Sequence, residues 1–258
     1  MKHLVLLGAF ALVTVLNAPA QDWAKARMEK SPRHLEWIKV KHGSREVNSF
    51  IAFPEVPDKA TAVVVIHEIF GHTDWVRELT DELAAAGYIA IAPDLLSGTP
   101  AERAGDNVRK EISQLPQDQI TADIQSAVDY VSKLPACNGK VVVAGFCWGG
   151  RESFRFACNS TNIKADFVFY GETPSETELK KITCPVYGFY AGNDARISAG
   201  VPATVEQMKK LGKTYEEVIY KGAGHGFMRA GEAPDASAAN KKAREEAWSR
   251  WMDLLKKI

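Results

Sequence analysis

The most informative stretch of the sequence is Val141-Val142-Val143-Ala144-Gly145-Phe146-Cys147-Trp148-Gly149-Gly150. Its first half is an unbroken apolar run, which is typical of a strand covered on both faces. The pattern Gly-x-Cys-x-Gly follows, and helix-compatible residues come next. This order predicts a strand, a tight turn and a helix, with Cys147 at the turn and the glycines letting strand and helix approach. The thiol would then face a helix N-terminus, which stabilises a thiolate. A buried structural cysteine is the alternative.

Similar patterns recur along the chain on both sides of this stretch. Continuous apolar runs predict buried strands, and apolar residues at helical spacing predict amphipathic helices. Strand-like segments lie at 62–66, 88–92, 140–145, 166–170, 186–190 and 216–220, and helical segments at 75–86, 120–134, 150–157, 203–211 and 240–256. This alternation predicts an α/β fold with a mostly parallel central sheet and helices on both faces.

The N-terminal part of the mature chain has a different character. Two strand-like runs, 36–41 and 46–53, flank His42-Gly43-Ser44 and predict an antiparallel hairpin. The polar segment 21–33 is expected to attach loosely to the rest. The irregular segment 97–117 is rich in glycine, proline and charge, and it is expected to lie over the sheet edge that faces the ligand crevice.

Residues 1–20 have the layout of a secretory signal peptide. Lys2 is positive, the run from Leu4 to Leu16 is almost entirely apolar, and Ala18-Pro19-Ala20 offers small residues to a signal peptidase. The apolar run is shorter than the roughly 20 residues that a membrane span needs. We therefore expect cleavage after Ala20, leaving residues 21–258 as a single domain that is periplasmic or secreted and not bound to a membrane.

The composition excludes several classes of protein. Of 258 residues, 46% are hydrophobic and 25% are charged, which is a globular rather than a disordered balance. The 32 Lys+Arg equal the 32 Asp+Glu, without the basic excess of a nucleic-acid binder. Four cysteines are too few for a disulfide-built scaffold, although a Cys137–Cys158 bond is feasible in an oxidising compartment. We expect a monomer or a small homo-oligomer with no nucleic-acid partner.

A cysteine nucleophile needs a base, and the base needs an acid that orients it. In this architecture the chain order is nucleophile, acid, histidine. His225 is the only histidine after Cys147, and Asp194 lies between them. Both follow predicted strands, whose carboxyl ends share one sheet edge. Cys147, Asp194 and His225 are therefore the predicted catalytic residues; an exposed loop histidine and a turn-capping aspartate are the alternatives.

The segment His67-Glu68-Ile69-Phe70-Gly71-His72 follows another predicted strand. It differs from the zinc motif H-E-x-x-H because the second histidine comes one residue late and Gly71 interrupts the helix, so no metal site is expected. The backbone N–H groups of Ile69 and Trp148 are candidates for an oxyanion hole. Glu68 would lie near Cys147, where it either takes the thiol proton or keeps the thiol protonated until substrate binds. A solvated loop glutamate is the alternative.

Together these segments resemble the dienelactone hydrolase family of the α/β-hydrolase superfamily. The matching segments are 67–71, 92–95, 145–150, 192–194 and 224–227. The resemblance implies the α/β-hydrolase fold, a Cys147-His225-Asp194 triad assisted by Glu68, an oxyanion hole formed by Ile69 and Trp148, and no cofactor. It also implies hydrolysis of a small carboxylic ester or lactone through a thioester acyl-enzyme.

Family members that open dienelactone hold the substrate carboxylate with two arginines. One lies four residues after the catalytic histidine, where this chain has Arg229, the predicted substrate-binding residue. The other comes shortly after the Pro-Asp-Leu segment, where this chain has no arginine before Arg103. An ester other than dienelactone is therefore plausible. Two further functions stay open: a non-catalytic binding protein on a hydrolase fold, and a thioesterase or acyltransferase that uses the same triad.

Overall fold

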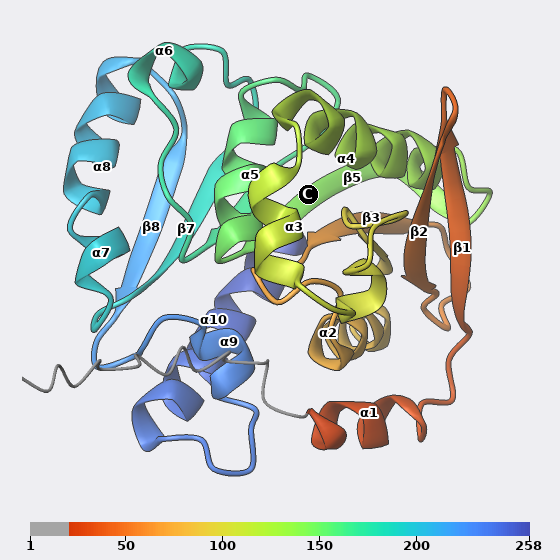
Figure 1. Ribbon diagram of the computed structural model, residues 1–258. Helices are drawn as coiled ribbons and strands as arrows, with labels where there is room; N and C mark the ends of the chain where they lie inside the picture. The colour runs from red at the N-terminus through yellow and green to blue at the C-terminus, as the bar shows by residue number, and fades with distance from the viewer. Residues whose placement is uncertain (1–20) are drawn as a thin grey trace, which may run out of the picture.

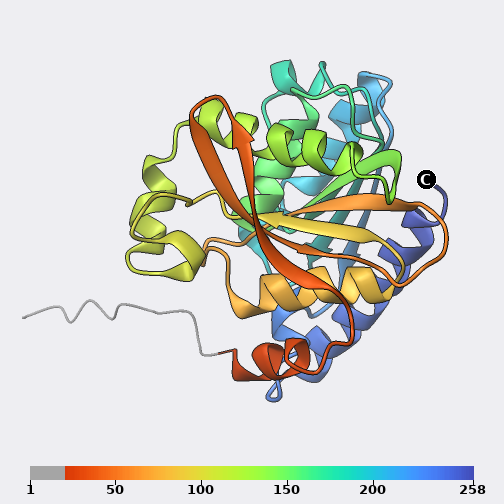
Figure 2. The same ribbon diagram turned by 90° about the vertical axis from the view of Figure 1, so that its right-hand side faces the viewer.

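The computed structural model describes residues 21–258, so the predicted signal peptide lies outside the described residues. The chain forms an eight-stranded sheet in the order β1-β2-β4-β3-β5-β6-β7-β8. Helices cover both faces of this sheet (Figure 1, Figure 2). The predicted α/β fold, with its mostly parallel sheet, is confirmed.

The antiparallel part of the sheet lies at one edge. Strands β1 (Leu35–His42) and β2 (Arg45–Ala52) form the predicted hairpin, and β2 pairs antiparallel with β4 (Ile89–Pro93). All later neighbours pair in parallel, because helices connect them. The parallel strands are β3 (Ala60–Ile66), β5 (Cys137–Phe146), β6 (Asp166–Phe169), β7 (Val186–Ala191) and β8 (Tyr215–Tyr220), together with β4.

The position of β3 in the middle of the sheet explains why the sequence of this strand is apolar throughout. Successive side chains of a strand point to opposite faces. Val63 and Val65 therefore pack into one core layer, while Val64 and Ile66 pack into the other. All four side chains are fully buried.

Two groups of helices supply these layers. Helices α1 (Asp22–Met28), α2 (Asp74–Ala85), α9 (Phe227–Ala230) and α10 (Ala238–Leu255) contribute to the layer of Val63. Helices α3 (Val108–Gln114), α4 (Gln117–Ser132), α5 (Trp148–Ala157) and α8 (Val201–Lys210) contribute to the layer of Val64. The short elements η1 (Glu102–Ala104), α6 (Glu176–Leu179) and α7 (Ala195–Ser198) lie in connections. None of the helices in residues 21–258 combines the length and the apolar character that crossing a membrane requires.

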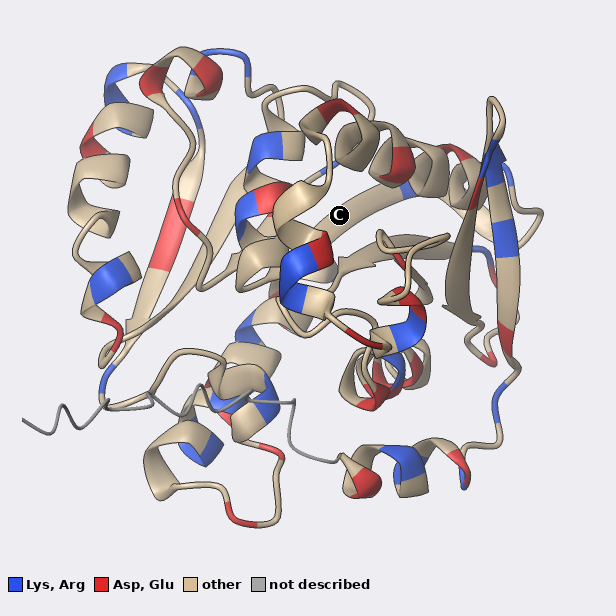
Figure 3. Cartoon of the chain, in the orientation of Figure 1, with Lys and Arg blue, Asp and Glu red and all other residues tan. Residues whose placement is uncertain are grey.

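Basic and acidic positions are interleaved along these elements (Figure 3). The totals of basic and acidic residues are equal, at 32 each.

The segment 21–33 is firmly docked, and the expectation of a loose attachment is wrong. The Gln21 side chain accepts a hydrogen bond of 2.7 Å from the backbone N–H of Trp75, in the first turn of α2. That turn has no side-chain cap of its own, so Gln21 satisfies an otherwise unpaired donor. Arg33 then holds the carboxylate of Asp81 through bonds of 2.6 and 2.8 Å.

The four cysteines are free thiols, so the feasible Cys137–Cys158 disulfide is not formed. Each of these two sulfurs has a backbone contact of its own. The Cys158 thiol donates to the carbonyl of Phe154 at 3.3 Å, and the Cys137 sulfur accepts from the N–H of Gly139 at 3.4 Å.

Candidate active site

Cys147 lies at the predicted turn between β5 and α5. Its backbone has φ 57° and ψ −117°, a conformation that costs free energy for a residue with a side chain. A Cβ atom on Gly145 would lie 2.0 Å from the Gly149 carbonyl oxygen, and one on Gly149 would lie 2.3 Å from the His67 oxygen. The turn therefore closes only because both positions are glycine.

The surroundings of Cys147 keep its thiol protonated in the free protein. Burial, followed by the negative charge of Glu68, raises the pKa of the thiol to about 11. The backbone amides of Trp148 and Ile69 act against this increase, because a nearby N–H group favours the thiolate. Ile69 and Trp148 line the same pocket as Cys147, and their role as an oxyanion hole stays a prediction.

His225 and Asp194 form a close pair at the same edge of the sheet. His225 Nδ1 lies 2.5 Å from Asp194 Oδ2, and the carboxylate is 8% exposed. Because an ionised carboxylate only accepts, Nδ1 carries the proton and Nε2 is left as a base. Within residues 21–258 no hydrogen bond joins His225 to the thiol of Cys147.

Glu68 is buried between two partners from distant parts of the chain. Its Oε2 atom accepts from Arg229 Nε at 2.6 Å, and its Oε1 atom accepts from the Tyr170 hydroxyl at 3.3 Å. The carboxylate is only 3% exposed, so the solvated-loop alternative is wrong. Arg229 is thereby engaged with Glu68, and its binding of substrate stays a prediction.

A second arginine lies near Arg229 that the sequence did not single out. The guanidinium groups of Arg109 and Arg229 lie 5.6 and 5.0 Å from the centre of the Phe70 ring. Arg109 belongs to α3, in the irregular segment that was expected near the crevice. The sequence could not identify Arg109, which lies beyond Arg103. The conformation of the loop before α3 decides how close the Arg109 side chain comes to Arg229.

His67 connects the two halves of the candidate oxyanion hole. Its Nδ1 atom lies 2.9 Å from the carbonyl oxygen of Glu68, and since a carbonyl only accepts, Nδ1 carries the proton. That carbonyl shares a peptide plane with the N–H of Ile69, so the bond fixes the direction of the N–H. The His67 ring also stacks on Trp148 with centroids 5.3 Å apart. Burial lowers the pKa of His67 and keeps the ring neutral.

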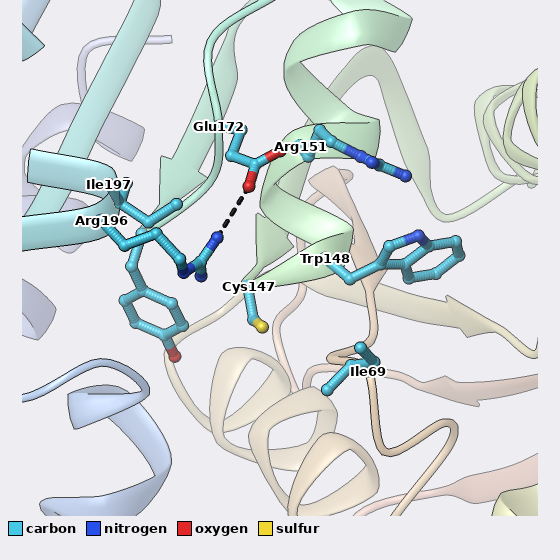
Figure 4. Close-up of a pocket in the computed structure, with 8 residues that line it drawn as sticks. Ile69, Cys147, Trp148, Arg151, Glu172, Arg196 and Ile197 are labelled. Carbon is cyan, nitrogen blue, oxygen red and sulfur yellow. Dashed lines mark hydrogen bonds and ion pairs between the residues drawn. The ribbon is translucent and has the colours of Figure 1, made fainter. Parts of the chain in front are cut away.

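A pocket of about 170 Å³ opens beside the thiol. Ile69 and Trp148 lie on one side of the Cys147 sulfur, and Arg196 lies on the other (Figure 4). Three charged lining residues, Arg151, Glu172 and Arg196, were not identified from the sequence. They stand in separate segments, and no motif marks them.

A cysteine at a strained strand-to-helix turn, on a mostly parallel sheet and with a histidine–aspartate pair at the same edge, defines the protein as an α/β-hydrolase. The model of the dienelactone hydrolase family matches residues 47–258. The chain therefore belongs to the dienelactone hydrolase family, and it is a hydrolase.

Individual relatives agree with this assignment. A protein of Saccharolobus solfataricus named "Putative carboxymethylenebutenolidase" is 31% identical over 252 residues, covering 83% of this chain and 95% of its own. A protein of the same name from Escherichia coli K12 is 29% identical over 209 residues, covering 75% and 76%.

Solved structures share the fold. The structure titled "Putative Dienelactone Hydrolase" from Klebsiella pneumoniae superposes with a TM-score of 0.77 at 24% identity, covering 88% of this chain and 99% of its own. A dienelactone hydrolase from Anabaena variabilis gives a TM-score of 0.62 at 18% identity, covering 83% and 96%.

Proposed function

We propose that this hydrolase cleaves small carboxylic esters or lactones, with Cys147 as nucleophile, His225 as general base and acid, and Asp194 as the residue that orients His225. The observation that carries the proposal is the strained turn at Cys147, which places the thiol in one pocket with Ile69 and Trp148. A substrate carbonyl carbon within reach of that thiol then has its oxygen within reach of the amides of these two residues.

The reaction begins with proton transfer from the thiol. His225 Nε2 takes the proton, and the sulfur attacks the carbonyl carbon to form a tetrahedral intermediate with its negative charge on oxygen. The amides of Ile69 and Trp148 stabilise that charge. The intermediate collapses to a thioester on Cys147, and His225 returns the proton to the departing alkoxide, which leaves as an alcohol. In a lactone the alcohol stays attached to the acyl group.

Hydrolysis of the thioester completes the cycle. His225 removes a proton from water, the hydroxide attacks the acyl carbon, and the carbon–sulfur bond breaks to release a carboxylic acid. The proton returns to the sulfur, which restores the thiol. Asp194 holds the imidazole in one tautomer throughout, through the 2.5 Å bond to Nδ1.

Glu68 assists by controlling when the sulfur ionises. Its charge is one of the causes that hold the pKa of Cys147 at about 11 in the free enzyme. A protonated thiol resists oxidation, because the thiolate is the reactive form. This protection suits the periplasmic or extracellular location that we propose from the N-terminal sequence. Arg229, paired with Glu68, is the proposed binding residue for an acidic substrate.

The test combines activity with detection of the acyl-enzyme. We expect Cys147→Ala to abolish hydrolysis of para-nitrophenyl esters and of simple lactones, and EDTA to leave wild-type activity in place. Mass spectrometry after brief mixing with an ester should find the acyl group on the peptide that contains Cys147.

A matched variant, Cys184→Ala, removes another buried thiol outside the site and should retain turnover. Full activity in Cys147→Ala would reject the mechanism. A wild-type protein that binds esters without cleaving them would favour a binding protein, and faster transfer to an added alcohol or amine than to water would favour an acyltransferase.

A further inference from the structure

The pocket beside Cys147 has an apolar side and a charged side. Ile69 and Trp148 line one side, while Arg196 and Glu172 bring opposite charges to the other side, next to Ile197 (Figure 4). The steps of the proposed reaction use the apolar side and its amides, and they leave the charged side without a role.

Arg196 lines the same pocket as the Cys147 thiol (Figure 4). Its positive charge acts on the Cys147 sulfur, where it favours the thiolate against the larger effects of burial and Glu68. Its place is also tied to the catalytic aspartate, because Asp194 is the N-cap of α7 and Arg196 lies in the first turn of that helix. A group bound to Arg196 therefore lies in the same pocket as the Cys147 thiol.

Glu172 is a counter-ion that a ligand can replace. Its Oε1 atom lies 2.7 Å from Arg196 Nη1, and the side chains of Arg196 and Glu172 are 61% and 50% exposed. An ion pair so exposed contributes little to stability, so exchanging its carboxylate for another costs little. The planar guanidinium suits a carboxylate in particular, because it can donate two parallel hydrogen bonds.

We propose that Arg196 is a specificity-determining residue that binds a carboxylate of the substrate, taking it in exchange for Glu172. The preferred substrates are then esters or lactones with a carboxylate close to the scissile carbonyl. Arg229 is a different contact, since it is paired with the buried Glu68 and does not line this pocket. The inference rests on the proposed function, because it takes Cys147 as the point of attack.

The experiment measures selectivity as a ratio of kcat/KM values in the full-length mature protein. The neutral probe is para-nitrophenyl pentanoate. Mono-para-nitrophenyl glutarate carries a carboxylate on the acyl chain, and meta-carboxyphenyl pentanoate carries one on the leaving group. Each charged probe is compared with the neutral one.

We expect Arg196→Ala to lower one of the two charged-to-neutral ratios about fivefold, the upper range for an exposed charge pair. The affected probe identifies the side of the scissile bond on which Arg196 binds. Arg196→Lys should restore part of the ratio, and Glu172→Gln should raise it, because the competing carboxylate is gone. High salt should reduce the wild-type ratio.

The control is Lys242→Ala, which removes the same charge from an exposed ion pair with Glu246 on α10. An equal fall in Lys242→Ala would assign the effect to net charge and overturn the inference. Both ratios staying within twofold of wild type in Arg196→Ala would also overturn it. Cys147-dependent activity with unchanged ratios would reject this inference alone, whereas activity that survives Cys147→Ala would reject the proposed function.

Discussion

Glu68 Oε2 lies 2.6 Å from Arg229 Nε, in an ion pair that joins the loop after β3 to α9. The pair keeps a buried negative charge next to Cys147, and this charge helps to raise the pKa of the thiol. Burial is the larger cause of the raised pKa, and the contact of Glu68 with Arg229, far apart in the chain, adds to it by holding the carboxylate in place.

Replacing Glu68 should make the thiol more reactive. In Glu68→Gln the negative charge is lost while Arg229 keeps its positive charge, so the pKa of Cys147 should fall from about 11. Below the pKa, each unit of decrease raises the thiolate fraction roughly tenfold. We expect faster alkylation of Cys147 by iodoacetamide at pH 8, followed by peptide mass spectrometry. The exposed Glu176→Gln is the control, and an unchanged rate profile in Glu68→Gln would contradict the assignment.

Replacing Asp194 should slow the chemical step. In Asp194→Asn the carboxylate that accepts from His225 Nδ1 is lost, and the imidazole is free to adopt the tautomer that cannot accept the thiol proton at Nε2. We expect kcat to fall by about 10³ to 10⁴ with a smaller change in KM. Steady-state kinetics measures both constants. The control is Asp253→Asn, on the surface of α10. A loss confined to KM would count against Asp194 as the orienting acid.

Replacing His67 should test how the Ile69 amide is held. His67→Leu removes the donor to the Glu68 carbonyl, whereas an asparagine side chain presents an N–H near the position of Nδ1. We expect His67→Leu to lower kcat by about 10² and His67→Asn to recover most of the loss. Similar kcat values for the two variants, both folded by circular dichroism, would show that the hydrogen bond does not position the amide.

The glycines of the turn should be needed for stability. A methyl group on Gly149 meets the His67 carbonyl oxygen at 2.3 Å, which the backbone cannot easily relieve. We expect Gly149→Ala to lower the free energy of unfolding by about 3 kcal/mol, the upper range for overpacking. Thermal or urea unfolding measures this. Gly200→Ala is the control, because its nearest atom is 3.5 Å away; equal Tm values for the two variants would refute the steric argument.

Cleavage of the predicted signal peptide can be tested by mass spectrometry of the purified protein. The sequence Ala18-Pro19-Ala20 predicts cleavage before Gln21. Expression in a bacterial host with intact export should give a periplasmic protein that begins at Gln21. An intact Met1 on protein recovered from the cytoplasm alone would contradict the predicted location.

The sequence alone was sufficient for the features that depend on local order. The apolar run before Gly145 predicts a buried strand, and the turn chemistry around Cys147 predicts the strained elbow, because both depend on neighbouring residues. The His225–Asp194 pair was also predictable, since the carboxyl ends of parallel strands share one edge. The docking of Gln21 against Trp75 was missed, because a polar segment gives no periodic signal for a contact with a distant helix end.

The sequence by itself determined the order of strands and helices and the residue types that carry the candidate chemistry, because backbone geometry turns periodicity and glycine placement into local structure. Only the tertiary structure decided what surrounds the sulfur: Glu68 against Arg229, His67 against Trp148, and Arg196 against Glu172. The physical reason is that the pKa of a thiol depends on charges and dipoles a few ångströms away in space, and folding brings those groups together from separate segments.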